Sequence, residues 1–201
     1  MAEIIHIRTG EHKLMLLRNH DTDMEIFIAA NASLKFYDLV NFIKEPTPSR
    51  INLTFHLEGE GSELLIRGRI IGKNDEDISR HILIQHSAGG CKSDTYYKYV
   101  LTDNSQGQFI GKVLVERDSQ QTDSVMLNRN LCLTKTSKMH SEPLLEIYAD
   151  DVKCSHGSSI GMLDEEALFY LQQRGIPRKE AIQLLVDAFI NEIQMPRLCV
   201  R

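Results

Sequence analysis

The sequence predicts an all-β body followed by a C-terminal pair of helices, and three observations support this fold class. Apolar and polar residues alternate in several stretches between Ile26 and Ala149, which is the period of half-buried strands. Clusters of Gly, Asn, Asp and Ser, which tolerate tight turns, separate these stretches. After Gly161 the apolar residues change to the spacing of an amphipathic helix.

Eight segments carry the alternation expected of a strand. In the first, apolar residues occupy every even position from Ile26 to Phe36, and the second runs from Ile51 to Leu57. Six more follow at residues 64–70, 82–86, 97–101, 109–115, 125–133 and 145–149. Many short strands with intervening turns fit a sandwich, a jelly roll or a β-solenoid. We find no strict internal repeat, which slightly disfavours the solenoid.

Two helices are predicted after the last strand. Asp164 is a suitable N-cap for a helix over residues 167–174, which Gly175 ends. Pro177 suits the first turn of a second helix that continues until Pro196. This second helix has apolar residues at helical spacing, namely Ile182, Leu185, Val186, Phe189 and Ile193.

The composition is that of a folded globular protein with a sizeable core. The 201 residues are 42% hydrophobic and 25% charged, which excludes intrinsic disorder and collagen-like structure. We expect a β body over residues 1–161 and a helical subdomain over residues 162–201.

The charge balance and the first residues bear on partners and location. The 23 Lys and Arg residues against 28 Asp and Glu residues give a net charge of −5, which argues against a nucleic acid or an anionic membrane as the main partner. The first residues lack the basic start and long apolar stretch of a secretory signal, and charges recur too often for a membrane span. The expected location is the cytoplasm.

Cys154 and His156 form the strongest candidate for chemistry. If the backbone is extended there, residues two apart point to the same face, as two ligands of one metal must. A thiolate and an imidazole suit iron, an iron–sulfur cluster or zinc. Two donors do not complete a site, so the others would come from another chain or from elsewhere in this one. The alternative is a buried structural Cys beside a hydrogen-bonded His.

The remaining cysteines and histidines have simpler interpretations. The cysteines, at positions 91, 132, 154 and 199, form no CxxC pair, so reduced thiols are expected. His86 lies on the apolar face of its predicted strand and is interpreted as a satisfied core or edge residue, as are His56 and His81.

Two enzyme classes are unsupported, and the helices carry a candidate docking face. The chain has no Gly-rich phosphate loop and no nucleophile elbow, so neither an ATPase nor a serine hydrolase is indicated. The apolar stripe of the helices is interpreted as packing. The alternative is a docking face for a partner protein. It is supported by Phe169, Tyr170 and Arg174, because aromatic and arginine side chains are enriched at interfaces.

Residues near the C-terminus resemble the signature of a known family. The run from Pro143 to Gly157, the run from Asp164 to Leu171, and Arg174-Gly175-Ile176 are similar to the C-terminal signature of the SufB/SufD family. This family serves the SUF system of iron–sulfur cluster assembly. The segments that precede the signature in the family are matched as well, by residues 107–113, 121–123 and 128–131.

The resemblance implies a fold and a role. It implies a right-handed parallel β-helix capped by C-terminal helices, acting as a non-catalytic scaffold subunit in a complex with SufB and the ATPase SufC. It also implies that no cofactor is stably bound and that a transient iron–sulfur cluster forms at a partner interface. The order of Cys154, Ser155 and His156 resembles the SufD branch rather than the SufB branch.

The resemblance also implies roles for individual residues. In SufD proteins the His at the position of His156 lies at the interface with SufB, which supplies the thiolate of the nascent cluster. Cys154 is its neighbour on this chain. The C-terminal helices of the family contact SufC, so the expected anchors here are Phe169, Tyr170, Arg174 and Phe189.

This chain departs from the family in length, and two other functions stay open. Family members are typically longer, so residues 1 to 50 are expected either to form a cap or to be covered by another subunit. A homodimer is plausible in the partner's absence. The first alternative function is a small metalloenzyme on a jelly roll that uses Cys154 and His156. The second is a purely structural β-helix that mediates assembly.

Overall fold

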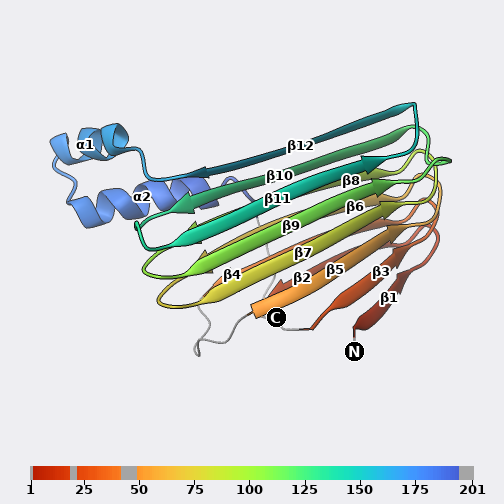
Figure 1. Cartoon of the computed structure of the whole chain (residues 1–201), viewed down its shortest axis with the longest axis horizontal. Coiled ribbons are helices and arrows are strands. Elements are labelled where there is room, and N and C mark those ends of the chain that lie inside the picture. Colours follow the sequence, from red (N-terminus) through yellow and green to blue (C-terminus); the bar gives the residue numbers. More distant parts are fainter. Residues whose placement is uncertain (1, 19–21, 42–48, 195–201) are drawn as a thin grey trace.

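Parallel strands wind into a two-sheet β-solenoid, and a helical pair follows its last strand (Figure 1). The structure is a computed structural model and describes residues 2–18, 22–41 and 49–194. The odd-strand sheet contains, in spatial order, β1 (Glu3–Ile7), β3 (Met24–Ile28), β5 (Ser49–Leu57), β7 (Asp77–His86), β9 (Gln106–Val115) and β11 (Lys138–Ile147). The even-strand sheet contains β2 (His12–Arg18), β4 (Ser33–Asn41), β6 (Glu63–Gly72), β8 (Lys92–Leu101), β10 (Thr122–Cys132) and β12 (Val152–Gly161). The predicted parallel β-helix is confirmed, whereas the sandwich and the jelly roll are not, because those folds need antiparallel strands.

Successive coils stack although their lengths differ, and the shortest spacing is the 21 positions between the paired residues Glu3 and Met24. Glu63 pairs with Lys92, which is 29 positions later, whereas Gln106 pairs with Lys138, which is 32 positions later. The coil length varies because the turns between strands differ, so the repeat exists in space without a fixed period in the sequence. The missing strict repeat was therefore a poor reason to disfavour the solenoid.

Several of the predicted strands have wrong limits, and β7 and β8 each begin five residues earlier than predicted. The expected strand from Ile26 to Phe36 is two strands, β3 and β4, which lie in different sheets. The chain turns between them at Asn31, whose φ is +54°. Small alanines on either side of Asn31 continued the alternation through the turn. The strand expected over residues 145–149 begins earlier, as β11. Three further strands, β1, β2 and β12, complete the coils.

The core fills the space between the two sheets. Inward residues of the two sheets pack against each other across the lumen, as the edge-on contact of the Phe36 and Phe55 rings illustrates, with centroids 5.3 Å apart. The packing is close enough to require a glycine at position 68. A Cβ there would lie 2.0 Å from the ring of Tyr97. Side chains of this size fill most of the lumen, so the interior of the solenoid is a packed core rather than an open tube.

The two helices, α1 (Glu165–Gln173) and α2 (Arg178–Ile190), begin as predicted. The Asp164 side chain accepts hydrogen bonds from the backbone N–H groups of Glu166 and Ala167, which confirms it as the N-cap. The second helix ends before the predicted limit, at Ile190, and Pro196 and Cys199 lie outside the described residues. Among the described residues no helix is long and apolar enough to cross a membrane.

A buried ion pair crosses the lumen. The Nε atom of Arg80 donates to Asp38 Oδ2 at 2.7 Å, and both side chains are fully buried. Tyr97 donates its hydroxyl proton to the same carboxylate oxygen at 3.1 Å. Removing one charge of such a pair leaves the other buried and unpaired, which is more costly than losing both.

Arg80→Met is therefore expected to lower the free energy of unfolding by about 3 to 5 kcal/mol. The double variant Asp38→Leu with Arg80→Met should recover most of this loss, because no unpaired charge is left. Urea unfolding measures both variants. Equal destabilisation by the single and double variants would contradict this assignment.

His86 gives the fold a pH dependence. It is completely buried, and its Nε2 atom lies 2.9 Å from the hydroxyl of Ser93. Burial lowers the pKa of this imidazole to about 4 from an ordinary 6.5. His86 is thus the core residue that the sequence predicts, and it is neutral in the folded state at neutral pH.

The unfolded chain binds a proton at His86 near pH 6.5 and the folded chain only near pH 4, so the unfolded state holds more protons between these values. The contribution of His86 is complete above pH 6.5 and is lost as the pH falls to 4, by up to about 3 kcal/mol. Urea unfolding as a function of pH measures this loss. His86→Met, which cannot titrate, should lose less stability over the same range, and identical profiles would refute the assignment.

Candidate functional site

The solenoid ends at β11 and β12, and this open end holds the candidate site. β12 pairs with β10 and β11 pairs with β9, and no strand of the described residues pairs with the outer side of either (Figure 1). The outer backbone N–H and C=O groups of both strands are therefore available to a partner. Inward-facing side chains of this last coil lack the further coil that buries such side chains elsewhere.

Cys154 and His156 both face this open lumen. β12 is extended through this segment, so residues two apart share a face. Cys154 is in register with Ser124 and His156 with Met126, and both of these β10 residues are buried inward-facing residues. The structure thus brings the thiol and the imidazole to one face of one strand.

The two side chains differ in accessibility. Cys154 is half-buried and packs against the lumen core, whereas His156 is exposed. Desolvation by burial raises the pKa of the Cys154 thiol, although a backbone hydrogen bond with Ser124 opposes this shift. An incoming metal or cluster therefore meets the imidazole more readily than the thiol. No group of three or more His, Cys, Asp or Glu side chains among residues 2–18, 22–41 and 49–194 could hold a metal ion.

A polar cluster that the sequence analysis did not find ties the last strands together. The Ser141 hydroxyl of β11 donates to Asn128 Oδ1 of β10 at 2.6 Å and lies 2.6 Å from the Ser158 hydroxyl of β12. Asn130 donates to the same Asn128 oxygen at 2.6 Å. These contacts join both sheets beside the strand that carries His156. Ser141 and Ser158 at inward-facing positions were the available sequence signal.

Apolar side chains surround the open end. They come from β11, from β12 and from the residues that follow each of these strands, and they are between 39% and 59% exposed: Leu144, Ile147, Tyr148, Ile160 and Met162. Exposed apolar groups along unpaired sheet edges are typical of protein–protein contacts. The outer carboxylate at this end, Glu146, is paired with Lys112 and is not free to bind a metal.

The helical pair presents a second surface. Phe169 and Tyr170 of α1 are 63% and 58% exposed. Arg174 donates to the Tyr170 hydroxyl at 2.8 Å and stacks its guanidinium 4.9 Å from the Tyr170 ring centroid. Leu184 of α2, which the sequence analysis did not single out, is also 51% exposed. These four side chains form the exposed face of the hairpin.

Phe189 lies elsewhere. It is half-buried, packs against the small cluster beneath α2, and its ring centroid is 4.0 Å from the ammonium group of Lys98. The ring is therefore engaged within the chain, in contrast to the expected anchors on α1.

Two other candidate histidines lie on the outer face of the odd-strand sheet. His56 bonds to Glu25 at 2.9 Å and stacks on Phe27, and His81 bonds to Gln108 at 3.0 Å. Each has a polar partner, as the sequence predicts, but both lie on central strands and point away from the core, so the predicted core or edge position is wrong. Neither lies near Cys154 in the strand register.

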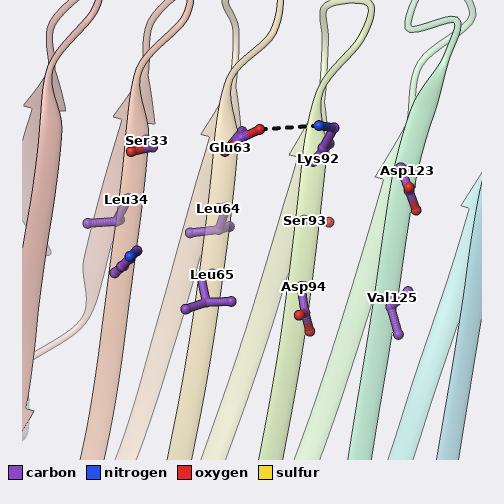
Figure 2. A pocket seen from close by; sticks show the side chains of 11 residues that line it. Ser33, Leu34, Glu63, Leu64, Leu65, Lys92, Ser93, Asp94, Asp123 and Val125 are labelled. Carbon is purple, nitrogen blue, oxygen red and sulfur yellow. Dashed lines mark hydrogen bonds and ion pairs between the residues drawn. The ribbon is translucent and has the colours of Figure 1, made fainter. Parts of the chain in front are cut away.

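A groove of about 410 Å³ on the outer face of the even-strand sheet is separate from this site. Figure 2 shows its side chains spread across β4, β6, β8 and β10, with Glu63 and Lys92 joined by an ion pair of 3.3 Å. None of its lining residues is a Cys or a His. The groove therefore lacks the donors that distinguish the open end.

The chain is similar to a family model of the SUF system and to several proteins named for iron–sulfur cluster assembly. Residues 44–189 match the family model described as SUF system FeS cluster assembly, SufBD core domain. The iron–sulfur cluster assembly protein SufD of Escherichia coli is 33% identical over 177 residues, which cover 88% of this chain and 41% of that protein. An iron–sulfur cluster assembly SufBD family protein of Synechocystis is 34% identical over 77% of this chain and 34% of its own length. The SufD protein of Plasmodium berghei is 28% identical over 96% of this chain and 14% of its own length. The chain thus spans less than half the length of these relatives.

The raised pKa of Cys154 predicts a slowly reacting thiol. Its alkylation by iodoacetamide is expected to reach half of its maximal rate at a higher pH than that of the same peptide in the unfolded chain, because only the thiolate reacts. Peptide mapping by mass spectrometry distinguishes Cys154 from the other cysteines. A Cys154 that reacts at the same pH in the folded and unfolded chains would show that its burial does not control the thiol.

Proposed function

Since the chain belongs to the SufBD family of the SUF iron–sulfur cluster assembly system, we propose that it is a SufD-like scaffold subunit without catalysis of its own. It contributes one side of an interface at which a nascent cluster is assembled. The observation that carries this proposal is the position of His156, an exposed imidazole on the last strand of a solenoid whose other inward-facing residues are largely buried.

The donor set suits cargo better than a resident metal. The described part of the chain offers one exposed imidazole and one half-buried thiol at the open end, which is fewer than the four ligands of a closed site. A partner thiolate would complete the coordination of an iron–sulfur cluster, for which soft sulfur ligands are preferred. A cluster held between two chains can be handed on when the chains separate.

The open end is the proposed surface for a SufB-like subunit. Free edges of β11 and β12 can accept strands from a second chain, and the exposed apolar residues around them provide buried area. A second copy of this chain is the competing occupant, since it presents the same edges.

The exposed face of the hairpin is the proposed surface for a SufC-like ATPase. Phe169 and Tyr170 supply apolar contact area, and Arg174 supplies a charged group held in place by Tyr170. ATP hydrolysis would belong to this partner. The alternative function was a metalloenzyme on a jelly roll, but the fold is a β-solenoid. Such an enzyme would also need at least two further ligands at the open end.

Co-purification of the tagged chain with SufB-like and SufC-like partners tests the two surfaces separately. His156→Ala is expected to keep both partners but to retain less than about a tenth of the cluster iron and sulfide. Phe169→Ala with Tyr170→Ala is expected to lose the ATPase and keep the SufB-like subunit. His140→Ala is the matched control, because His140 is an exposed histidine on the outer face of the neighbouring strand β11.

Three outcomes would contradict the proposal. Normal cluster content in the His156→Ala complex would leave a purely structural role. Equal loss of cluster with His140→Ala would remove the special role of position 156. A chain that binds neither partner would restrict the family relationship to fold and ancestry.

A further inference from the structure

The hairpin is held on the outer face of the even-strand sheet by a buried lysine. The Lys98 side chain of β8 is completely buried, although lysine is rarely found so. Its ammonium group donates to the backbone carbonyl of Phe189 at 2.5 Å and to Glu192 Oε2 at 2.5 Å. It also lies over the Phe189 ring. We refer to Lys98, Phe189 and Glu192 as the Lys98 latch.

The Lys98 latch places a cation at the C-terminus of α2. The last turn of this helix carries no basic residue, so its terminal carbonyl groups have no cation of their own. Lys98 donates to one of these carbonyls from a strand that lies 91 residues earlier in the chain. Two further side chains reinforce the contact, since Tyr96 of the same strand β8 donates to Glu192 at 2.9 Å and Arg129 of the neighbouring β10 lies 3.8 Å from it.

The apolar part of this attachment is separate from the solenoid core. Val100 and Leu131, on the outer side of the sheet, pack with Val186 and Ile190 of α2 in a cluster distinct from the core of the lumen. α1 packs on α2, and α2 in turn contacts β8 of the even-strand sheet. Removing the hairpin would therefore expose this small cluster and leave the lumen filled.

Charged groups of the sheet beneath α2 would be hydrated again if the helix separated from the sheet. Desolvation lowers the pKa of Lys98 and of Arg69, which shows that burial disfavours both charges. The buried Nε of Arg69 has no hydrogen-bond partner among the described residues. An attachment that combines a small apolar cluster with desolvated charges is less strongly held than a purely apolar one, because part of the cost of separation is offset by hydration.

We propose that the Lys98 latch is a releasable attachment, and that breaking it frees α1 and α2 together from the even-strand sheet while the solenoid stays folded. The release needs no opening of the lumen and no change in the strand register. This inference concerns the chain alone and does not depend on the partners proposed above.

Hydrogen exchange of the full chain, followed by mass spectrometry, tests the release. Lys98→Met keeps a long unbranched side chain at this position but removes the ammonium group. Exchange in α1 and α2 is expected to rise by about 10- to 100-fold. The exchange rate follows the local opening equilibrium, and the loss of two charge-assisted hydrogen bonds shifts this equilibrium toward the open state. The reference strands are β5, β7 and β9 of the odd-strand sheet, which lie away from the contact of α2 with β8. Exchange in these strands is expected to stay unchanged.

Lys92→Met is the matched control, because Lys92 lies on the same strand and its ion pair with Glu63 is exposed on both sides. It should leave the exchange of the helices unaltered. Glu192→Gln is a milder second variant that keeps the shape of the side chain and should give the same pattern with a smaller rise. It carries the test if Lys98→Met does not fold.

Two results would overturn the proposal. Exchange in α1 and α2 that stays within about twofold of the unaltered chain in both variants would show that the latch does not hold the hairpin. An equal rise in the helices and in β5, β7 and β9 would show that the hairpin and the solenoid open as one unit.

Discussion

The in-register stacking of parallel coils is the constraint on which the rest of the structure depends. Because neighbouring strands pair residue for residue, inward side chains form rows that cross one sheet. One such row contains Ile66, Thr95, Met126 and His156. The first three are completely buried, and the fourth is exposed because no further coil of the described chain covers it. The candidate site is thus the last position of a core row.

This arrangement separates two tasks in space. The open end carries the candidate metal donors Cys154 and His156 on β12, a strand that the solenoid holds in register. The hairpin carries the exposed aromatic face on a unit that is attached from outside the lumen. A scaffold that must hold a cluster at one surface and a partner at another can change either surface without disturbing the other.

Local features were predictable from the sequence, and long-range ones were not. The Asp164 cap and the start of both helices depend on a few adjacent residues, and the alternation of β5, β6 and β9 depends on burial of one face. The turn at Asn31 was missed because alanines kept the alternation on both sides. Coil stacking was not predictable from periodicity, since the spacing of paired residues varies from 21 to 32. The engagement of Phe189 depends on Lys98, 91 residues away, and no local pattern reports it.

The central claim is that His156 binds a cluster that a partner completes. Electron–nuclear double resonance of the reduced cluster tests it most directly, in a complex reconstituted from separately expressed chains of which only this chain carries ¹⁵N-histidine. The account predicts a ¹⁵N coupling of a directly bound imidazole that is absent from the His156→Ala complex. A cluster with thiolate ligands alone, or a nitrogen coupling that persists in that variant, would contradict it.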